Sequence, residues 1–163
     1  MISTRSILIK LWLTNYFVNF LMLIMERRDY LIHQIQEMGA FLVRLILRLK
    51  KEHLPSAQFE AVRAELEDEL ALKLDDVLFL EDQAFVDVLE EKLLSDENML
   101  QFAFLLEQLG DVALEDETFL RQQVYYHKAL ALLVYVEHKS QNYSMERQQK
   151  IANLRAKLDN HSD

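Results

Sequence analysis

The strongest pattern in the chain is a run of eight consecutive apolar residues, Ala129 to Val136, inside the stretch from Phe119 to Lys139. A helix that carries such a run has no face that can be given wholly to water, so we expect neighbours on most of its sides. A second apolar run, Met99 to Leu106, precedes it, and an amphipathic stretch that opens at Ser144 follows it. The pattern therefore predicts three packed antiparallel helices with residues 119–139 at their centre.

A second helical pattern follows Asp29, where apolar residues recur at spacings of four and three. Ile32, Val43 and Ile46 widen this stripe beyond the narrow seam of a coiled coil, so a helix of a globular bundle is favoured. Gly39 lies inside this helix, where glycine costs roughly 1 kcal/mol relative to alanine, which predicts the close approach of a neighbouring helix. The seam consists of Leu31, Ile35, Met38, Leu42, Leu45 and Leu49.

Few residues interrupt these patterns, since the chain has only two glycines and one proline. A sandwich, a barrel or an α/β fold needs more turn-forming residues, so the fold class predicted is all-α. Pro55 and Ser56 open a new helix, and Gly110 is expected in the left-handed conformation that often ends one. With further helices at about 83–94 and 96–109, we expect a single-domain bundle of about five to seven helices.

The N-terminus differs in composition from the rest of the chain. Residues 7–25 are long enough and apolar enough to cross a bilayer, although Lys10, Asn15 and Asn19 interrupt them. No Asp or Glu occurs before residue 25, whereas all 27 follow. Three interpretations stay open for residues 1–24: translated upstream sequence before a true start at Met25, a genuine membrane anchor, or a soluble helix that packs on the domain. Residues 25–163 are predicted to form one helical domain.

Charge is distributed unevenly, and the net charge is −9. Residues 54–118 carry most of the acidic groups, and residues 119–163 are mildly basic. We expect the basic ends to complement the acidic middle within the protein, with attraction of a basic partner as the alternative. Arg44, Arg48 and Lys51 form a short basic strip, but without interleaved aromatic residues or glycine loops it indicates a solvated helix end rather than binding of nucleic acid.

Residues that could carry out chemistry do not form a recognisable set. The absence of cysteine excludes disulfides and thiolate sites, and two isolated glycines cannot build a phosphate-binding loop. None of the five histidines follows a Glu at the spacing of a dimetal helix site, and the acidic clusters lack the alternating pattern of a calcium loop. We therefore predict no catalytic residue, no metal and no cofactor. The candidates for a groove or interface are Tyr125, Tyr126, Ala129 and Tyr135, although aromatic residues on an apolar stripe are more often core.

Two stretches resemble known helical proteins. Residues 25–46 (MERRDYLIHQIQEMGAFLVRLI) are similar to the start of a family of small uncharacterised bacterial helical proteins. Residues 105–110 (LLEQLG) and 125–154 resemble a tetratricopeptide-like helical pair and its following helix. Leu109-Gly110 would stand for the Leu-Gly of the first helix, and Ala129 for the small residue of the second. Gly110 and Ala129 are farther apart than in that motif, and no second copy follows at a fixed period. The resemblance implies a tetratricopeptide-like hairpin in the C-terminal half and residence in the bacterial cytoplasm, with no assigned activity.

The function predicted from these features is a noncatalytic cytoplasmic module for protein–protein interaction or self-association. Its partner would be another protein or a second copy of the chain, and not a nucleic acid. The alternative is a membrane-tethered adaptor anchored by residues 7–25. A third interpretation is a bundle enzyme or a ligand-binding protein with an unrecognised polar pocket.

Overall fold

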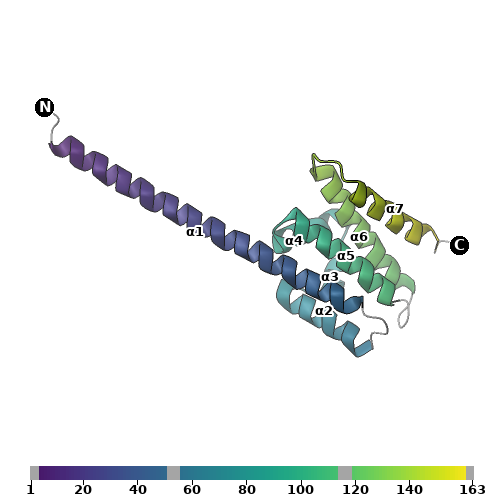
Figure 1. Cartoon of the computed structure of the whole chain (residues 1–163). Helices are drawn as coiled ribbons and strands as arrows, with labels where there is room; N and C mark the ends of the chain where they lie inside the picture. Colours follow the sequence, from purple (N-terminus) through teal and green to yellow (C-terminus); the bar gives the residue numbers. More distant parts are fainter. Residues whose placement is uncertain (1–3, 51–55, 114–118, 161–163) are drawn as a thin grey trace. The chain divides into compact units, whose positions relative to one another are not determined.

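The structure, a computed structural model, describes residues 4–50, 56–113 and 119–160, and its regular elements there are seven α-helices (Figure 1). The prediction of an all-α bundle of about five to seven helices is confirmed. The chain separates into an N-terminal unit, Met1–Glu37, and a C-terminal unit, Met38–Asp163, with the division inside α1. The helices are α1 Thr4–Leu49, α2 Ser56–Leu70, α3 Leu74–Leu78, α4 Asp82–Leu93, α5 Asp96–Ala113, α6 Phe119–Lys139 and α7 Met145–Asp159.

The N-terminal unit contains one helix, the part of α1 that precedes Met38. Taken by itself, this helix has apolar side chains on every side, and its most apolar window has a mean hydropathy of 1.7 with none of its residues buried. By length and composition α1 can cross a membrane. A single helix has no second element against which to bury these side chains, so their surroundings must come from outside the unit.

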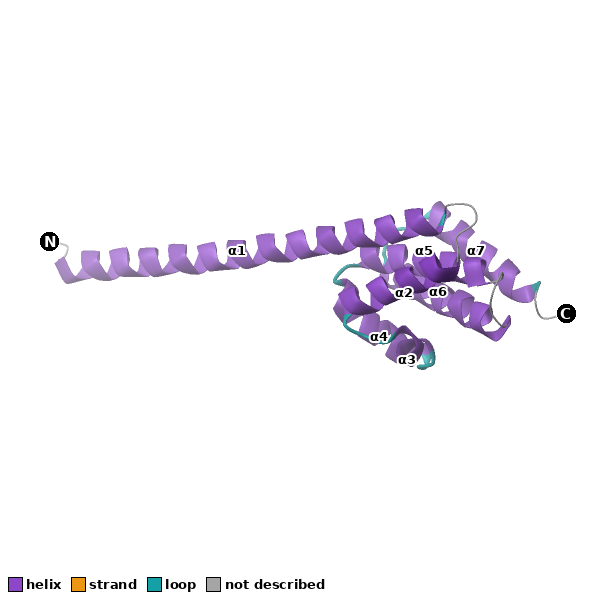
Figure 2. Ribbon diagram, turned by 90° about the horizontal axis from the view of Figure 1, so that it is seen from below, coloured by secondary structure: helices purple, strands orange, loops and turns teal. Residues whose placement is uncertain are grey.

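In the C-terminal unit α5, α6 and α7 lie side by side (Figure 1, Figure 2). Gln122, near the start of α6, bonds the carbonyl of Gly110, near the end of α5, so these two helices are antiparallel. Glu137, near the end of α6, pairs with Arg147 at the start of α7, so the next two are antiparallel as well. Because α6 also contacts α3 and α4, the prediction of a central helix at residues 119–139 is confirmed.

The last part of α1, from Met38 to Leu49, belongs to the core of the C-terminal unit. Of the predicted seam, Met38, Leu42, Leu45 and Leu49 are buried there. Of the three residues that widen the stripe, Ile46 is buried and Val43 is exposed, while Ile32 is exposed in the N-terminal unit. In α2 the core residues are Phe59, Val62, Leu66 and Leu70.

The two glycines serve close packing. The predicted helix end at Gly110 is wrong, because α5 continues to Ala113 and no glycine has a positive φ among the described residues. A Cβ atom at Gly110 would lie 2.6 Å from Cε1 of Tyr126, so glycine is required there by the crossing of α5 and α6. The close approach predicted at Gly39 is confirmed, since a Cβ atom there would lie 2.9 Å from Oδ1 of Asn98.

Two serines cap the N-termini of helices in the described part of the chain. Ser144 Oγ accepts a hydrogen bond from the backbone N–H of Arg147, and Ser95 Oγ accepts one from that of Asn98. The left-handed residues that follow α2 and α4 are Ala71 and Leu94, not glycines. The predicted break at Pro55 lies outside the described residues.

Candidate functional site

Ion pairs join the acidic middle of the C-terminal unit to its basic end. Three lysines of α6 and α7 lie next to carboxylates of α4 and α5. Their closest N–O distances are 2.6–2.8 Å. The predicted internal complementation of charge is therefore confirmed for these groups. The pairs are Lys128 with Asp82, Lys139 with Glu90 and Asp96, and Lys157 with Glu107 and Asp111.

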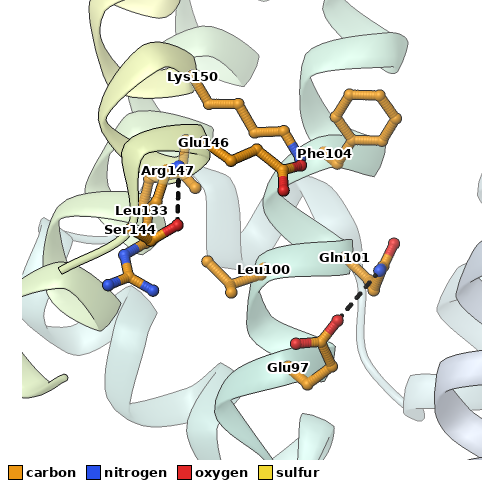
Figure 3. A pocket seen from close by; sticks show the side chains of 9 residues that line it. All are labelled: Glu97, Leu100, Gln101, Phe104, Leu133, Ser144, Glu146, Arg147 and Lys150. Atoms are coloured by element: carbon orange, nitrogen blue, oxygen red, sulfur yellow. Dashed lines mark hydrogen bonds and ion pairs between the residues drawn. The ribbon is translucent and has the colours of Figure 1, made fainter. Parts of the chain in front are cut away.

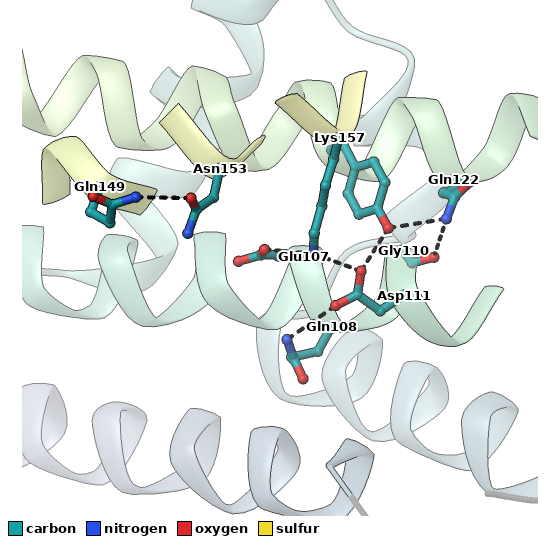
Figure 4. Close-up of polar contacts among 9 residues, drawn as sticks. Glu107, Gln108, Gly110, Asp111, Gln122, Gln149, Asn153 and Lys157 are labelled. Carbon is teal, nitrogen blue, oxygen red and sulfur yellow. Dashed lines mark hydrogen bonds and ion pairs between the residues drawn. The ribbon is translucent and has the colours of Figure 1, made fainter. Parts of the chain in front are cut away.

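The most connected polar cluster lies where α5, α6 and α7 meet (Figure 4). Tyr126 donates its hydroxyl proton to Asp111 Oδ1 at 2.6 Å, and Gln122 Nε2 donates to Tyr126 Oη at 3.0 Å and to the carbonyl of Gly110 at 3.2 Å. Lys157 Nζ donates to the same Asp111 oxygen at 2.8 Å. The carboxylate of Asp111 in α5 thus bonds both α6 and α7.

Two groups of this cluster, Tyr126 and Lys157, have a raised pKa. Burial, helped by the hydrogen bond to Asp111, raises the pKa of the Tyr126 hydroxyl well above its ordinary value. Burial alone would lower the pKa of Lys157, but its hydrogen bonds to Asp111 and Glu107 outweigh that effect and raise it. Tyr126 therefore stays a neutral hydrogen-bond donor and Lys157 stays charged, which suits a structural clamp and not an acid–base pair.

The candidate groove residues of the sequence lie mostly in the core. Tyr125, Tyr126 and Ala129 are buried against neighbouring helices and belong to the core, the alternative that the sequence favoured for the tyrosines. The reason is that α5 crosses α6 at Gly110 and covers this side of it. Tyr135 is partly exposed, and its hydroxyl donates to Glu90 Oε1 at 2.9 Å, which raises the pKa of that hydroxyl.

A small cavity of about 260 Å³ lies between α5, α6 and the start of α7 (Figure 3). Its two basic groups already have partners within the protein. Arg147 pairs with Glu137, and Lys150 Nζ lies 3.1 Å from Glu146 Oε1 and 4.9 Å from the centre of the Phe104 ring. Such a site has room for a small polar molecule but offers no activated nucleophile. The lining residues are Glu97, Leu100, Gln101, Phe104, Leu133, Ser144, Glu146, Arg147 and Lys150.

We find no candidate metal site in the part of the chain that the structure describes. There, no three His, Asp or Glu side chains come together in an arrangement that could hold a metal ion. The acidic groups are instead spread along the helices, and several of them are neutralised by the lysine pairs described above.

Two apolar surfaces stand out among the residues that the structure describes. The first is the all-round apolar helix of residues 7–25 in the N-terminal unit. The second is a face of α1 within the C-terminal unit, where Val43 and Leu47 are exposed beside a shallow hollow of about 520 Å³. Arg44, over the Phe41 ring, and Arg48, paired with Glu65, flank this face, so part of the predicted basic strip is engaged within the protein.

Sequence reasoning missed both the cavity and the cluster around Asp111. The sequence places Asp111 just beyond a helix, because it predicts a helix end at Gly110. One signal was available: Gln122 and Tyr126 are four residues apart and so share a helix face. Nothing in the sequence pairs that face with Asp111 or Lys157.

Comparison with known proteins identifies no relative of this chain. No protein-family model, no curated protein and no solved structure matches the chain. The resemblances to a tetratricopeptide-like hairpin and to a bacterial helical family therefore stay predictions.

Proposed function

We propose that this chain is a noncatalytic helical interaction module that is held at a membrane by residues 7–25. One observation carries the proposal: these residues form a helix that is apolar on all sides, and in the N-terminal unit its side chains are exposed. Exposed apolar side chains on every face of a helix are stable in hydrocarbon and unstable in water. A bilayer is the environment that suits this surface.

The dimensions of the segment support this environment. At about 1.5 Å per residue, residues 7–25 extend over roughly 28 Å, close to the roughly 30 Å of a bilayer's hydrocarbon core. Lys10 lies near one end of the segment, where its long side chain can reach the headgroup region, and Arg27 and Arg28 follow the other end. Charged groups are thus absent from the central part of the segment.

The C-terminal unit supports the noncatalytic part of the proposal. Its buried and half-buried polar groups, such as Tyr126, Asp111 and Lys157, bond one another across helix contacts. An enzyme site requires at least one activated group that faces a substrate. A module whose polar groups are used up in bonds between its own helices is better suited to presenting a surface to another protein than to catalysis.

Fractionation of cells tests the membrane attachment. The full chain should sediment with membranes, resist an alkaline carbonate wash and be released by detergent, whereas a chain that lacks residues 1–24 should be soluble. A matched control keeps the length and replaces Val18 and Leu21 by arginine, since each arginine near the centre of a membrane helix costs about 2.5–3.5 kcal/mol on insertion. A full chain that stays soluble, or a shortened chain that sediments equally, contradicts the proposal.

The second candidate function is a cytoplasmic module that self-associates or binds another protein without a membrane. The exposed face of Val43 and Leu47 favours it, because this apolar surface lies in the C-terminal unit and outside residues 7–25. A full chain recovered in the soluble fraction as a homo-oligomer or in a complex supports this candidate over the first.

A further inference from the structure

The apolar stretch of α1 contains two amide side chains, Asn15 and Asn19. They are four residues apart, so they lie on the same side of the helix, one turn from each other. Both are exposed in the N-terminal unit, and among the described residues neither has a hydrogen-bond partner for its side chain. Two polar groups therefore stand together on a surface that is otherwise apolar.

A neighbouring polar side chain shows the contrast. Thr14 Oγ1 donates a hydrogen bond to the backbone carbonyl of Lys10 at 2.8 Å, so its hydroxyl is satisfied inside its own helix. An asparagine amide has two N–H donors and one carbonyl acceptor, which is more than its own helix can satisfy. In hydrocarbon no solvent molecule is available to bond them, so Asn15 and Asn19 require a partner with polar groups at the same depth.

We infer that Asn15 and Asn19 join the membrane segments of two copies of this chain through amide–amide hydrogen bonds. The inference rests on the proposed membrane attachment. A second copy fits for two reasons: an amide is its own complement, because it donates and accepts at once, and copies inserted in one orientation have their helices parallel. Parallel packing brings Asn15 to the depth of Asn15 in the partner, and Asn19 to that of Asn19.

The rest of this helix face is suited to packing. Leu8, Trp12 and Met22 continue the side of Asn15 and Asn19 at spacings of four and three, the repeat of two helices that pack along their length. Beside Asn15 a shallow hollow of about 530 Å³ is lined by Leu8 and Trp12, among others, and leaves room for side chains of a second helix. Phe17 and Ile24 lie on the opposite side of the helix.

Cysteine cross-linking tests the inference cleanly, because the chain has no cysteine and an introduced one is its sole thiol. The full chain is reconstituted in phosphatidylcholine vesicles as Met22→Cys, on the asparagine side, or as Ile24→Cys, on the opposite side, and is then oxidised. Met22→Cys should form disulfide-linked dimers, and Ile24→Cys should form few. Addition of Asn15→Leu and Asn19→Leu to Met22→Cys should lower the linked fraction about tenfold, as expected for the loss of one to two interhelical hydrogen bonds.

Thr14→Val provides the matched control, since it removes a polar group that is already satisfied within the helix. It should leave cross-linking of Met22→Cys unchanged. Equal cross-linking of the two cysteine positions, or a yield that the asparagine substitutions do not alter, overturns the inference. The same vesicles are sedimented and washed with carbonate: a chain that is retained but not cross-linked overturns this inference alone, and a chain that is washed off overturns the membrane attachment as well.

Discussion

Two stretches of this chain are apolar on every side of a helix, and they meet opposite surroundings. Residues 129–136 belong to α6, which packs against α3, α4, α5 and α7, and Ala129, Leu132, Leu133 and Val136 are buried. Residues 7–25 of α1 belong to a unit with no second helix, and their large apolar side chains are exposed there. The apolar side chains of residues 129–136 are thus covered by the protein itself, whereas those of residues 7–25 need a covering from outside their unit.

The difference shows what an all-round apolar helix requires. Hydrophobic side chains are stabilised by removal from water, whatever material replaces the water. For α6 that material is the rest of the C-terminal unit, held in register by polar clamps such as Tyr126 with Asp111. For the N-terminal part of α1, we propose that a bilayer replaces the water, and that a second copy of the helix does so at the two asparagines.

Replacing one leucine by alanine in each stretch should give the largest difference between them. Leu132 is 0% exposed, so Leu132→Ala should lower the free energy of unfolding of the C-terminal unit by about 2–5 kcal/mol through lost contacts and a cavity. Leu13 is 52% exposed in the N-terminal unit, so Leu13→Ala should leave that free energy unchanged. Urea unfolding of the full chain in detergent, followed by circular dichroism, measures both. Equal losses would show that the two stretches are packed alike.

The tightness of the α5–α6 crossing gives a smaller effect. Gly110→Ala places Cβ 2.6 Å from Cε1 of Tyr126, whose ring is 2% exposed and whose hydroxyl is held by Asp111. We expect a loss of about 1–3 kcal/mol in the free energy of unfolding from overpacking. Gly39→Ala is the matched control: its contact with Asn98 is looser, at 2.9 Å, and a gain of about 1 kcal/mol in helix propensity opposes the strain.

The melting temperatures of the two glycine variants check this order. Gly110→Ala should melt clearly below the native chain, and Gly39→Ala close to it. A Gly110→Ala chain that melts at the native temperature would mean that α6 is not held as closely by α5 as the Tyr126 contact indicates.

The smallest effect concerns the ion pair between α6 and α7. Hydrogen bonds from Arg147 and Gln148 lower the pKa of Glu137. A lowered pKa in the folded state gives stability that is present above the ordinary glutamate pKa of about 4.3 and is lost as the pH falls through the folded value. Glu137→Gln should therefore flatten the fall of the melting temperature in acid, measured from pH 7 downward.

Glu146→Gln is the control for this pH dependence. Glu146 pairs with Lys150 on the surface of α7, and its side chain is largely exposed, so its substitution should change the acid response little. If both variants respond alike, the fall in acid arises from net charge and not from the contact between α6 and α7.

Much of the fold could be predicted because its signals are local. The apolar run at 129–136 indicated a central helix, Ser144 indicated a cap, and Gly39 indicated a close approach, and all three are confirmed. The interpretation of Gly110 failed because a glycine near an apolar stretch is equally consistent with a helix end and with a helix crossing. That choice depended on where the Tyr126 ring lies.

The candidate site was less accessible to sequence reasoning. Tyr125 and Tyr126 were candidates for a groove because an apolar stripe with tyrosines fits either a core or a ligand surface. Their burial follows from the way α5 covers α6, which no spacing within α6 encodes. Asn15 and Asn19, in contrast, were visible as interruptions of an apolar segment, and the structure adds that nothing in the described chain satisfies their amides.

By itself the sequence determined the helices, the central position of α6 and the apolar character of residues 7–25, since helical periodicity and breaker residues act over a few positions of the chain. Only the tertiary structure decided which groups meet across helices: Gly110 with Tyr126, Asp111 with Lys157, and Lys139 with Glu90. The physical reason is that a helix pair's crossing and register arise from all of its packed side chains together, and a contact at one position is a consequence of that sum.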